Sequence, residues 1–423
     1  MFTPGQVKIV TIVGARPNFM KAAPIIRAFR EHNAKQKAPQ IDHLLVHTGQ
    51  HYDELMSDRF FADLGLPEPD VYLGVGSGSH ARQTAQILEK FEDVLLREKP
   101  DVVIVVGDVN STFACALAAG KISFDSIGSR PLIAHVEAGL RSFDRSMPEE
   151  VNRILTDHVS DLFFVTEESG SQNLRNEGVS PDKIHFVGNT MIDSLLTFTE
   201  KADASTILED LGLRADVEKD GTTTAIGRYA LLTLHRPSNV DDRDAFLNIL
   251  EGLEELAAEW PIVFVVHPRT QQRIKEFGSE LHIKAKAGRI DDHASNSGNL
   301  GPGVILTSPL GYLDFLCLMK HAAIVVTDSG GIQEETTCLR IPCVTVRENT
   351  ERPVTVESGT NIVGGIRKEG IKAAIRGQRM RKCYNSNPKH WDGHAAQRIL
   401  DHLIRAHYER NTSRPAFIPQ PCD

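Results

Sequence analysis

The sequence has few cysteines, few aromatic residues and no long apolar run. Its 6 cysteines among 423 residues show no Cys-x-x-Cys spacing, so neither a disulfide framework nor a zinc site is expected. With 47 Lys and Arg against 56 Asp and Glu, the net charge of −9 argues against bulk binding of nucleic acid or of an anionic membrane. Since no apolar run could span a bilayer or form a signal-peptide core, we expect a cytoplasmic protein.

A dinucleotide fingerprint of the Gly-x-Gly-x-x-Gly type is also missing, so the sequence gives little support for NAD. The first apolar run instead ends in Gly14 and leads through Arg16 into a helical pattern that carries Lys21. Cations near a helix N-terminus oppose the helix dipole unless an anion lies between them, which makes this a candidate phosphate site. The simpler alternative is that Arg16 and Lys21 are solvated side chains that bind no anion.

Short apolar runs alternate with helical periods along the whole chain, which is typical of parallel sheets covered by helices on both faces. Eleven strands are expected, at 7–13, 42–47, 101–106, 131–136, 162–165, 184–187, 229–233, 261–266, 304–306, 323–327 and 342–346. Because eleven strands are more than one doubly wound sheet usually contains, we predict an α/β protein of two Rossmann-like halves with a ligand cleft between them.

The expected domain boundaries follow from this pattern. The N-terminal domain covers 1–190 and the second domain 191–385, while 386–423 is expected to form a helix packed back on the first domain and a frayed tail from 409. Polar stretches that read as surface insertions lie at 120–130, 214–228 and 284–303.

Three acidic residues of the first half are candidates for one site. Asp108 and Glu137 follow predicted strands closely, and Glu149 lies in the first turn of the helical pattern that begins at Pro148. Because parallel strands end at one edge of a sheet, these carboxylates can reach one cleft, which favours proton-transfer chemistry on a phosphorylated ligand. Plainer interpretations remain for each: Asp108 as a helix cap, Glu137 as the partner of Arg141, and Glu149 as an acid in a helix first turn.

In the second half, a β-branched run is broken by Ser329, Gly330 and Gly331 before a helical pattern begins. Two adjacent glycines let a ligand approach the backbone, and the N–H groups that open the helix favour a phosphate. A tight turn capped by Asp328 or Ser329 is the alternative. His235 stands at the exit of another predicted strand of this half.

Eight motifs occur in one order along the chain: GARPNFMK, HTGQHYD, GDVNST, HVEAGLR, PEEVNR, LHRP, DSGGIQEE and ERP. In this order they resemble the non-hydrolysing UDP-N-acetylglucosamine 2-epimerases, which share the two-domain GT-B fold of nucleotide-sugar glycosyltransferases. The resemblance runs from Gly14 to about Arg352 and is less distinct beyond.

The resemblance implies roles for individual residues. The positions that match catalytic groups of the family are Asp108, Glu137, Glu149 and His235. Those that match substrate contacts are Arg16, Lys21, Arg153, Phe315, Ser329, Gly330, Gly331, Glu335 and Arg352. Among them the Ser-Gly-Gly turn matches the diphosphate site, Phe315 an aromatic near the uracil, and Glu335 a ribose-binding acid.

The implied reaction inverts carbon 2 of the sugar without cofactor or metal. UDP leaves carbon 1 while the carbon 2 proton is removed, and it re-adds after protonation on the opposite face. Asp108 and Glu137 are expected to transfer protons at carbon 2, with Glu149 as an orienting or second acid–base group. His235 would assist at the diphosphate or leaving oxygen. The family further implies a homodimer, closure of the two halves, and a product used for cell-surface polysaccharides.

Several alternatives stay open at this stage. HTGQHYD also resembles relatives that epimerise UDP-2,3-diacetamido-glucuronic acid, and a hydrolysing relative that releases N-acetylmannosamine differs mainly in how water is excluded. A GT-B glycosyltransferase or a non-catalytic nucleotide-sugar-binding protein would be a different class. Some family members are activated by substrate through glutamines in this segment. Here Tyr52 and Asp53 follow Gln50 in place of a second glutamine, so activation is left open.

Overall fold

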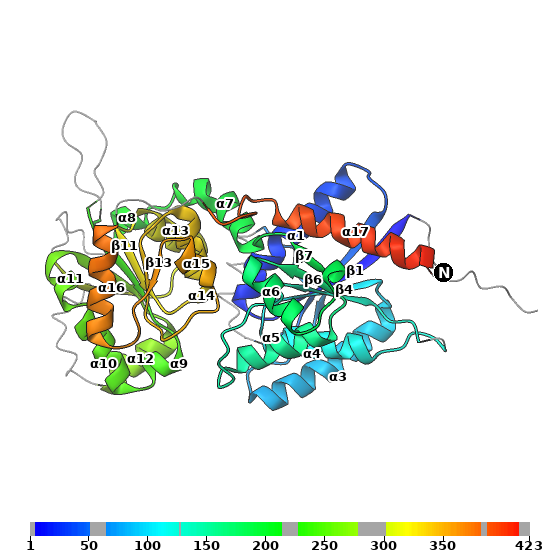
Figure 1. The fold of residues 1–423 in the computed structure, drawn as a ribbon, viewed down its shortest axis with the longest axis horizontal. Coiled ribbons are helices and arrows are strands. Elements are labelled where there is room, and N and C mark those ends of the chain that lie inside the picture. Colours follow the sequence, from blue (N-terminus) through cyan, green and yellow to red (C-terminus); the bar gives the residue numbers. More distant parts are fainter. Residues whose placement is uncertain are drawn as a thin grey trace, which may run out of the picture. The chain divides into compact units, whose positions relative to one another are not determined.

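The computed structural model describes residues 5–50, 65–126, 128–213, 227–277, 302–381 and 387–413. The chain forms two compact units (Figure 1). The first contains Met1–Ser194 and Asp392–Asp423, and the second contains Leu195–Trp391. Each unit is built on one parallel sheet, with seven described strands in the first and six in the second. The predicted fold class, α/β with two Rossmann-like halves, is confirmed.

The first sheet has the strand order β3-β2-β1-β4-β5-β6-β7, and every neighbouring pair is parallel. The strands are β1 Gln6–Val13, β2 Gln40–His47, β3 Val71–Tyr72, β4 Val102–Val106, β5 Leu132–Val136, β6 Leu162–Val165 and β7 Ile184–Phe186. The order reverses between β1 and β4, and ligands of open α/β sheets bind at such a switch point, outside the carboxyl ends of the strands.

Helices cover both faces of this sheet (Figure 1). The helices of this unit are α1 Arg16–Ala34, α3 His80–Glu98, α4 Asn110–Lys121, α5 Pro148–Val159, α6 Glu168–Asn176, the 3-10 turn Pro181–Lys183 and α17 Ala395–Ser413. The boundary between the two units falls inside α7, Thr190–Ala202. All five residues of β4 are buried, because α3 and α4 pack on one face and α1 and α17 on the other. A near-continuous apolar strand is what two covered faces require.

The C-terminal helix α17 belongs to the first unit although its sequence follows the second. Its Ile399, Leu400 and Leu403 join the core that also contains Phe29 of α1, and Figure 1 shows α17 in red beside α1. The helix continues to Ser413, into the segment predicted as a tail, and near its end Arg410 donates a hydrogen bond to a backbone carbonyl of the first unit.

The second sheet repeats the same arrangement, with the order β10-β9-β8-β11-β12-β13 and parallel pairs throughout. The strands are β8 Ala230–Thr233, β9 Pro261–Val265, β10 Gly303–Thr307, β11 Ile324–Thr327, β12 Cys343–Thr345 and β13 Asn361–Val363. The helices are α8 Ile207–Asp210, α9 Pro237–Val240, α10 Arg243–Gly252, α11 Glu254–Glu259, α12 Pro268–Phe277, α13 Tyr312–His321, α14 Gly330–Leu339, α15 Pro353–Glu357 and α16 Lys368–Met380. Here the switch point lies between β8 and β11.

All eleven predicted strands are present, each within two residues of its expected ends. The two that the sequence did not reveal, β3 and β13, are short strands at the edges of their sheets. An edge strand is covered less than a central one, so it does not need the continuous apolar run by which the others were recognised. Most of the predicted insertions at 214–228 and 284–303 lies outside the described residues. None of the described helices is both long and apolar enough to cross a membrane.

Candidate active site

A buried ion pair lies at the switch point of the first sheet. Lys21 of α1 contacts the carboxylate of Glu137, which directly follows β5, and the two side chains are only 7% and 6% exposed. A carboxylate buried at this depth needs a partner. Arg141, the partner considered from the sequence, instead contacts Asp157 and Glu177. That interpretation of Glu137 is therefore wrong: its cation comes from α1, across the switch point.

The turn after β4 passes directly beside this pair. Gly107 has φ +71°, and a Cβ at this position would lie 3.3 Å from Nζ of Lys21 and 3.9 Å from Oε2 of Glu137. Glycine is required here both by the backbone conformation and by the close approach. Asn18 of α1 donates from Nδ2 to the carbonyl of Val106 at 2.8 Å, which ties α1 to the same turn. The turn delivers the next residue, Asp108, to this point.

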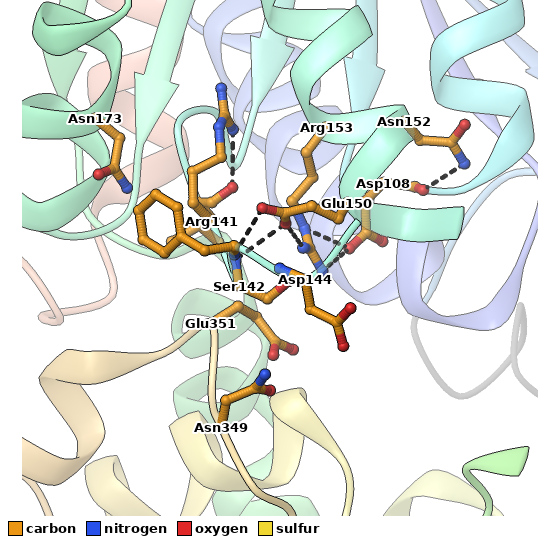
Figure 2. A network of polar contacts seen from close by, with 12 residues as sticks. Asp108, Arg141, Ser142, Asp144, Glu150, Asn152, Arg153, Asn173, Asn349 and Glu351 are labelled. Carbon is orange, nitrogen blue, oxygen red and sulfur yellow. Dashed lines mark hydrogen bonds and ion pairs between the residues drawn. The ribbon is translucent and has the colours of Figure 1, made fainter. Parts of the chain in front are cut away.

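Asp108 is held by an arginine of α5 (Figure 2). Arg153 donates to Oδ2 of Asp108 from Nε at 3.0 Å and lies 2.8 Å from it through Nη2. Asn152 donates to the backbone carbonyl of Asp108 at 3.0 Å. The alternative of a helix cap is wrong, because the N-cap residue of α4 is Val109. The Asp108 side chain keeps 22% of its surface exposed, so it is both oriented and reachable.

Two adjacent glutamates lie in the first turn of α5 and have different surroundings. Glu149, the predicted acid, is partly exposed. Glu150 is 1% exposed and accepts hydrogen bonds from the backbone N–H groups of Ser142 at 3.0 Å and Phe143 at 2.8 Å. It also contacts Nη1 of Arg153 at 2.5 Å, so it shares that arginine with Asp108 (Figure 2). The sequence analysis missed Glu150.

Helix α5 packs its polar face against the protein interior. Its buried residues are Glu150, Asn152, Arg153, Thr156 and Asp157, while Val151 and Leu155 are 37% and 39% exposed. The signal that could have revealed this face is the spacing of Glu150, Arg153 and Asp157 at i, i+3 and i+7, which places the three on one side of a helix. Buried charges of both signs compensate one another there.

Arg16 is the first residue of α1, at the carboxyl end of β1. This places its backbone at the switch point between β1 and β4, while its side chain lies outside the described part of the structure. Within the described residues, no group of three or more His, Cys, Asp or Glu is arranged to hold a metal ion.

In the second unit, His235 follows β8 and pairs with Asp328, which follows β11. Nδ1 of His235 lies 2.7 Å from Oδ1 of Asp328, and the aspartate also accepts from the backbone N–H groups of His235 and Arg236. Burial would raise the pKa of Asp328, but His235 and these N–H groups hold it below its usual value. Asp328 therefore does not cap α14; it orients His235, whose side chain is 44% exposed.

The Ser-Gly-Gly turn begins α14. Ser329 is its N-cap residue without a side-chain capping bond, and helical residues start at Gly330. A Cβ on Gly330 would lie 2.7 Å from Oε1 of Glu351, whose carboxylate contacts Arg347 at 2.7 Å. Burial would raise the pKa of Glu351, but the neighbouring arginines Arg347, Arg352 and Arg236 depress it. Gly331 follows in the first turn and, like Gly330, is partly exposed.

The remaining predicted residues of this unit are Glu335 on α14, Phe315 on α13 and Arg352, which precedes α15. Glu335 is buried and accepts a hydrogen bond from Oη of Tyr312 at 3.1 Å; burial raises its pKa to about 7 against the effect of that bond. Arg352 pairs with Glu334 through Nε at 2.7 Å, with both side chains at most 5% exposed. Phe315 lies one turn after Tyr312 on α13 and is partly exposed.

Comparison with known proteins identifies the family. Residues 33–404 match the family model described as UDP-N-acetylglucosamine 2-epimerase. A UDP-N-acetylglucosamine 2-epimerase of Methanocaldococcus jannaschii is 41% identical over 404 residues, which is 95% of this chain and 100% of that protein. A UDP-2,3-diacetamido-2,3-dideoxy-D-glucuronate 2-epimerase of Pseudomonas aeruginosa is 38% identical over 402 residues, 94% of this chain and 100% of that one.

Solved structures agree with this assignment. The crystal structure of the Methanocaldococcus jannaschii UDP-GlcNAc 2-epimerase in complex with UDP-GlcNAc and UDP matches with a TM-score of 0.79 at 40% identity, covering 94% of this chain and 99% of that chain. The Neisseria meningitidis UDP-GlcNAc 2-epimerase bound to UDP-GlcNAc matches with a TM-score of 0.77 at 28% identity, covering 94% and 100%. Since the likeness spans nearly the whole length in sequence and in fold, the chain belongs to the UDP-N-acetylglucosamine 2-epimerase family.

Proposed function

We propose that this protein reversibly epimerises UDP-N-acetylglucosamine to UDP-N-acetylmannosamine by eliminating and re-adding UDP, without net hydrolysis. Membership in the family supports a 2-epimerase. The observation that carries the chemistry is the Lys21–Glu137 ion pair beside the Gly107 turn and Asp108. It brings two carboxylates to the carboxyl ends of adjacent strands, where α/β sheets bind ligands. The product would be a precursor for cell-surface polysaccharide.

In this proposal Asp108 and Glu137 carry the proton transfers at carbon 2. The reaction needs a base on one face of the sugar and an acid on the other, each within hydrogen-bond reach of the reacting carbon. Arg153 fixes the carboxylate of Asp108, and Lys21 stabilises charge on Glu137 while keeping it in place. Glu149 is assigned the orienting or second acid–base role. Arg153 also contributes to substrate contact through the same face of α5.

The residues of the second unit would bind and stabilise UDP. The N–H groups of Ser329, Gly330 and Gly331 at the start of α14 suit a diphosphate, since a helix N-terminus favours negative charge. His235 is oriented through Nδ1 by Asp328, so its Nε2 is the nitrogen assigned to the diphosphate or the departing oxygen. Further contacts in this unit are assigned to the uracil, the ribose and the phosphates, through Phe315, Glu335 and Arg352. From the first unit, Arg16 and Lys21 are assigned to the nucleotide and its diphosphate.

The test is proton NMR of UDP-N-acetylglucosamine incubated with the protein in deuterium oxide and no added cofactor. We expect UDP-N-acetylmannosamine to form, with deuterium at carbon 2 of both sugars. Asp108→Asn should abolish most of the exchange, by about 100-fold or more as expected for loss of a proton-transfer group. Asp42→Asn, which removes one exposed carboxylate of β2 in the same unit, is the matched control and should exchange like wild type.

The other outcomes separate the alternatives. Free N-acetylmannosamine with UDP would place the protein among hydrolysing relatives, and sugar transfer to an acceptor would indicate a glycosyltransferase. Tight binding of the UDP-sugar without isomerisation or UDP release would indicate a binding protein.

A second candidate substrate is UDP-2,3-diacetamido-glucuronic acid. The relative from Pseudomonas aeruginosa, whose name specifies that substrate, is 38% identical to this chain, against 41% for the UDP-N-acetylglucosamine 2-epimerase of Methanocaldococcus jannaschii. The same exchange experiment with both sugars decides between them: faster deuterium incorporation into the diacetamido-uronate would move the proposal to that substrate while leaving the proton chemistry unchanged.

A further inference from the structure

His135 is a fully buried residue of β5, two positions before Glu137. Both of its ring nitrogens face oxygen atoms: Nε2 lies 2.8 Å from the backbone carbonyl of Gly107, and Nδ1 lies 2.6 Å from Oδ1 of Asp157. A carbonyl oxygen can only accept a hydrogen bond, so Nε2 carries a proton. Nδ1 and Oδ1 of Asp157 share the second hydrogen bond of the ring.

Asp157 is tied to two further groups near the ring. Its second oxygen, Oδ2, accepts from the backbone N–H of Gly139 at 3.1 Å and pairs with Nη2 of Arg141 at 2.7 Å. Burial would raise the pKa of Asp157, but His135 and Arg141 hold it below its usual value. Asp157 therefore joins the His135 ring to the backbone after β5 and to Arg141.

The ring lies inside a network of charged side chains from three segments. Asp157 comes from α5, Arg141 from the segment after β5, and Glu177 at the end of α6 binds Arg141 at 2.6 and 2.8 Å. Arg141 thus lies between two carboxylates, of which Asp157 is buried and Glu177 is 28% exposed. Lys21 and Glu137 next to Gly107 form a separate pair. Because a buried charge needs such a partner, the network holds Asp157, and through it His135, in place.

The His135–Asp157 pair connects two turns. Through Nε2 it holds the carbonyl of Gly107, directly before Asp108. Through Asp157 it holds the N–H of Gly139, two residues after Glu137. The Gly107 peptide is held from its other side too, since its N–H donates to the carbonyl of Val136 at 3.0 Å. One buried pair therefore fixes the spacing between the turns that carry the two carboxylates.

We propose that His135, bound to the carbonyl of Gly107 and to Asp157, is a positioning residue that sets the distance and direction between Asp108 and Glu137. Its effect on turnover rests on the function proposed above. Simple packing is a poor explanation, because an apolar side chain would fill the same place in β5 without the cost of burying polar groups. Proton transfer, by contrast, is sensitive to displacements of about 1 Å, which can lower a rate about 100-fold.

The first test changes the residue and separates turnover from binding. His135→Gln keeps one N–H donor but cannot bridge Gly107 and Asp157 as the ring does. We expect kcat for carbon 2 exchange to fall about 100-fold, with KM and the Kd for UDP less than about threefold changed because His135 bonds to none of the residues assigned to UDP. His32→Gln is the control: His32 of α1 is also buried and bonds to the carbonyl of Pro39 at 2.9 Å, away from both turns. It should keep wild-type turnover.

The second test needs neither a variant nor activity. Nitrogen-15 NMR of the wild-type His135 ring should show the proton on Nε2 that the Gly107 carbonyl requires, and an unprotonated Nε2 would overturn the proposal. It would also be overturned by wild-type kcat in His135→Gln, or by parallel loss of kcat and UDP affinity, since either excludes a specific positioning effect. If His135→Gln does not fold, the NMR result decides. A protonated Nε2 in a protein that shows no epimerisation would refute the proposed function alone.

Discussion

Lys21 and Glu137 form an ion pair inside the first unit, with less than a tenth of either side chain exposed. The lysine lies on the helix after β1 and the glutamate at the end of β5, so the pair crosses the point where the strand order reverses. The turn at Gly107 can pass beside it only because glycine has no side chain. The ion pair therefore lies directly beside the turn that leads into Asp108.

Lys21→Met should lower the stability of the first unit, because it leaves the Glu137 carboxylate buried without its cation. We expect a loss of about 3–5 kcal/mol in the free energy of unfolding, the usual cost of breaking a buried pair from one side. Denaturant unfolding measures it. Lys8→Met is the control in the same unit: Lys8 pairs with Glu98 at 2.7 Å but is 29% exposed, so its loss should cost less than about 1 kcal/mol.

The double variant Lys21→Met with Glu137→Leu separates stability from function. Apolar replacement of both partners removes the unpaired charge, so most of the stability should return. Turnover should not return, because the proposed proton-transfer group is gone. Recovery of both properties would exclude Glu137 from the chemistry.

The two glutamates at the start of α5 should respond differently to substitution. Glu150→Gln replaces a buried carboxylate that binds Arg153 and two backbone N–H groups, so we expect a stability loss of about 2–3 kcal/mol. Glu149→Gln changes a partly exposed residue, and its stability should stay within about 0.5 kcal/mol of wild type while kcat falls. Thermal unfolding and the exchange assay, run on both variants, check this contrast. A large loss of stability in Glu149→Gln would contradict it.

Gly330→Ala should weaken UDP binding and destabilise the second unit. The added Cβ would lie 2.7 Å from a carboxylate oxygen of Glu351, which cannot move aside easily because it is 4% exposed and paired with Arg347. Overpacking of this kind costs about 1–3 kcal/mol. Gly377→Ala is the matched control: its Cβ would meet Ile362 at an ordinary 3.4 Å within α16, where alanine should stabilise the helix by about 1 kcal/mol. Calorimetry with UDP measures the affinity of each.

The stability of the second unit should fall as pH rises because of Glu335. Burial raises the pKa of this carboxyl from 4.5 to about 7, so between these values the folded protein binds more protons than the unfolded chain. Stability therefore decreases from pH 4.5 to 7 and levels off above, with a total of about 3 kcal/mol.

Replacing Glu335 should remove this dependence. Glu335→Gln is expected to be more stable than wild type at pH 8 and equal to it near pH 4.5. Tyr312→Phe, which removes a hydrogen bond that lowers the pKa of Glu335, should move the titration to higher pH. Unfolding curves across this pH range measure both effects. A Glu335→Gln curve parallel to wild type would show that another group is responsible.

The arrangement of the strands could be predicted because it depends on local pattern. A central parallel strand such as β4 must be apolar at every position, since helices cover both faces, and that run is visible in the sequence. The residues just after such strands fall at one edge of the sheet by topology alone. Asp108 and Glu137 could therefore be selected as candidates before any contact was known.

The partners of these residues could not be predicted, because they depend on packing between distant elements. The sequence suggested Arg141 for Glu137, four positions away, whereas the cation is Lys21 from the far side of the switch point. In α5 the apolar residues Val151 and Leu155 are exposed and the charges are buried, the reverse of an ordinary surface helix. The sequence by itself determined two Rossmann-like halves and the strand ends that bear the candidate groups. Only the tertiary structure decided which charges neutralise one another, because a buried charge is stabilised by the partner nearest in space.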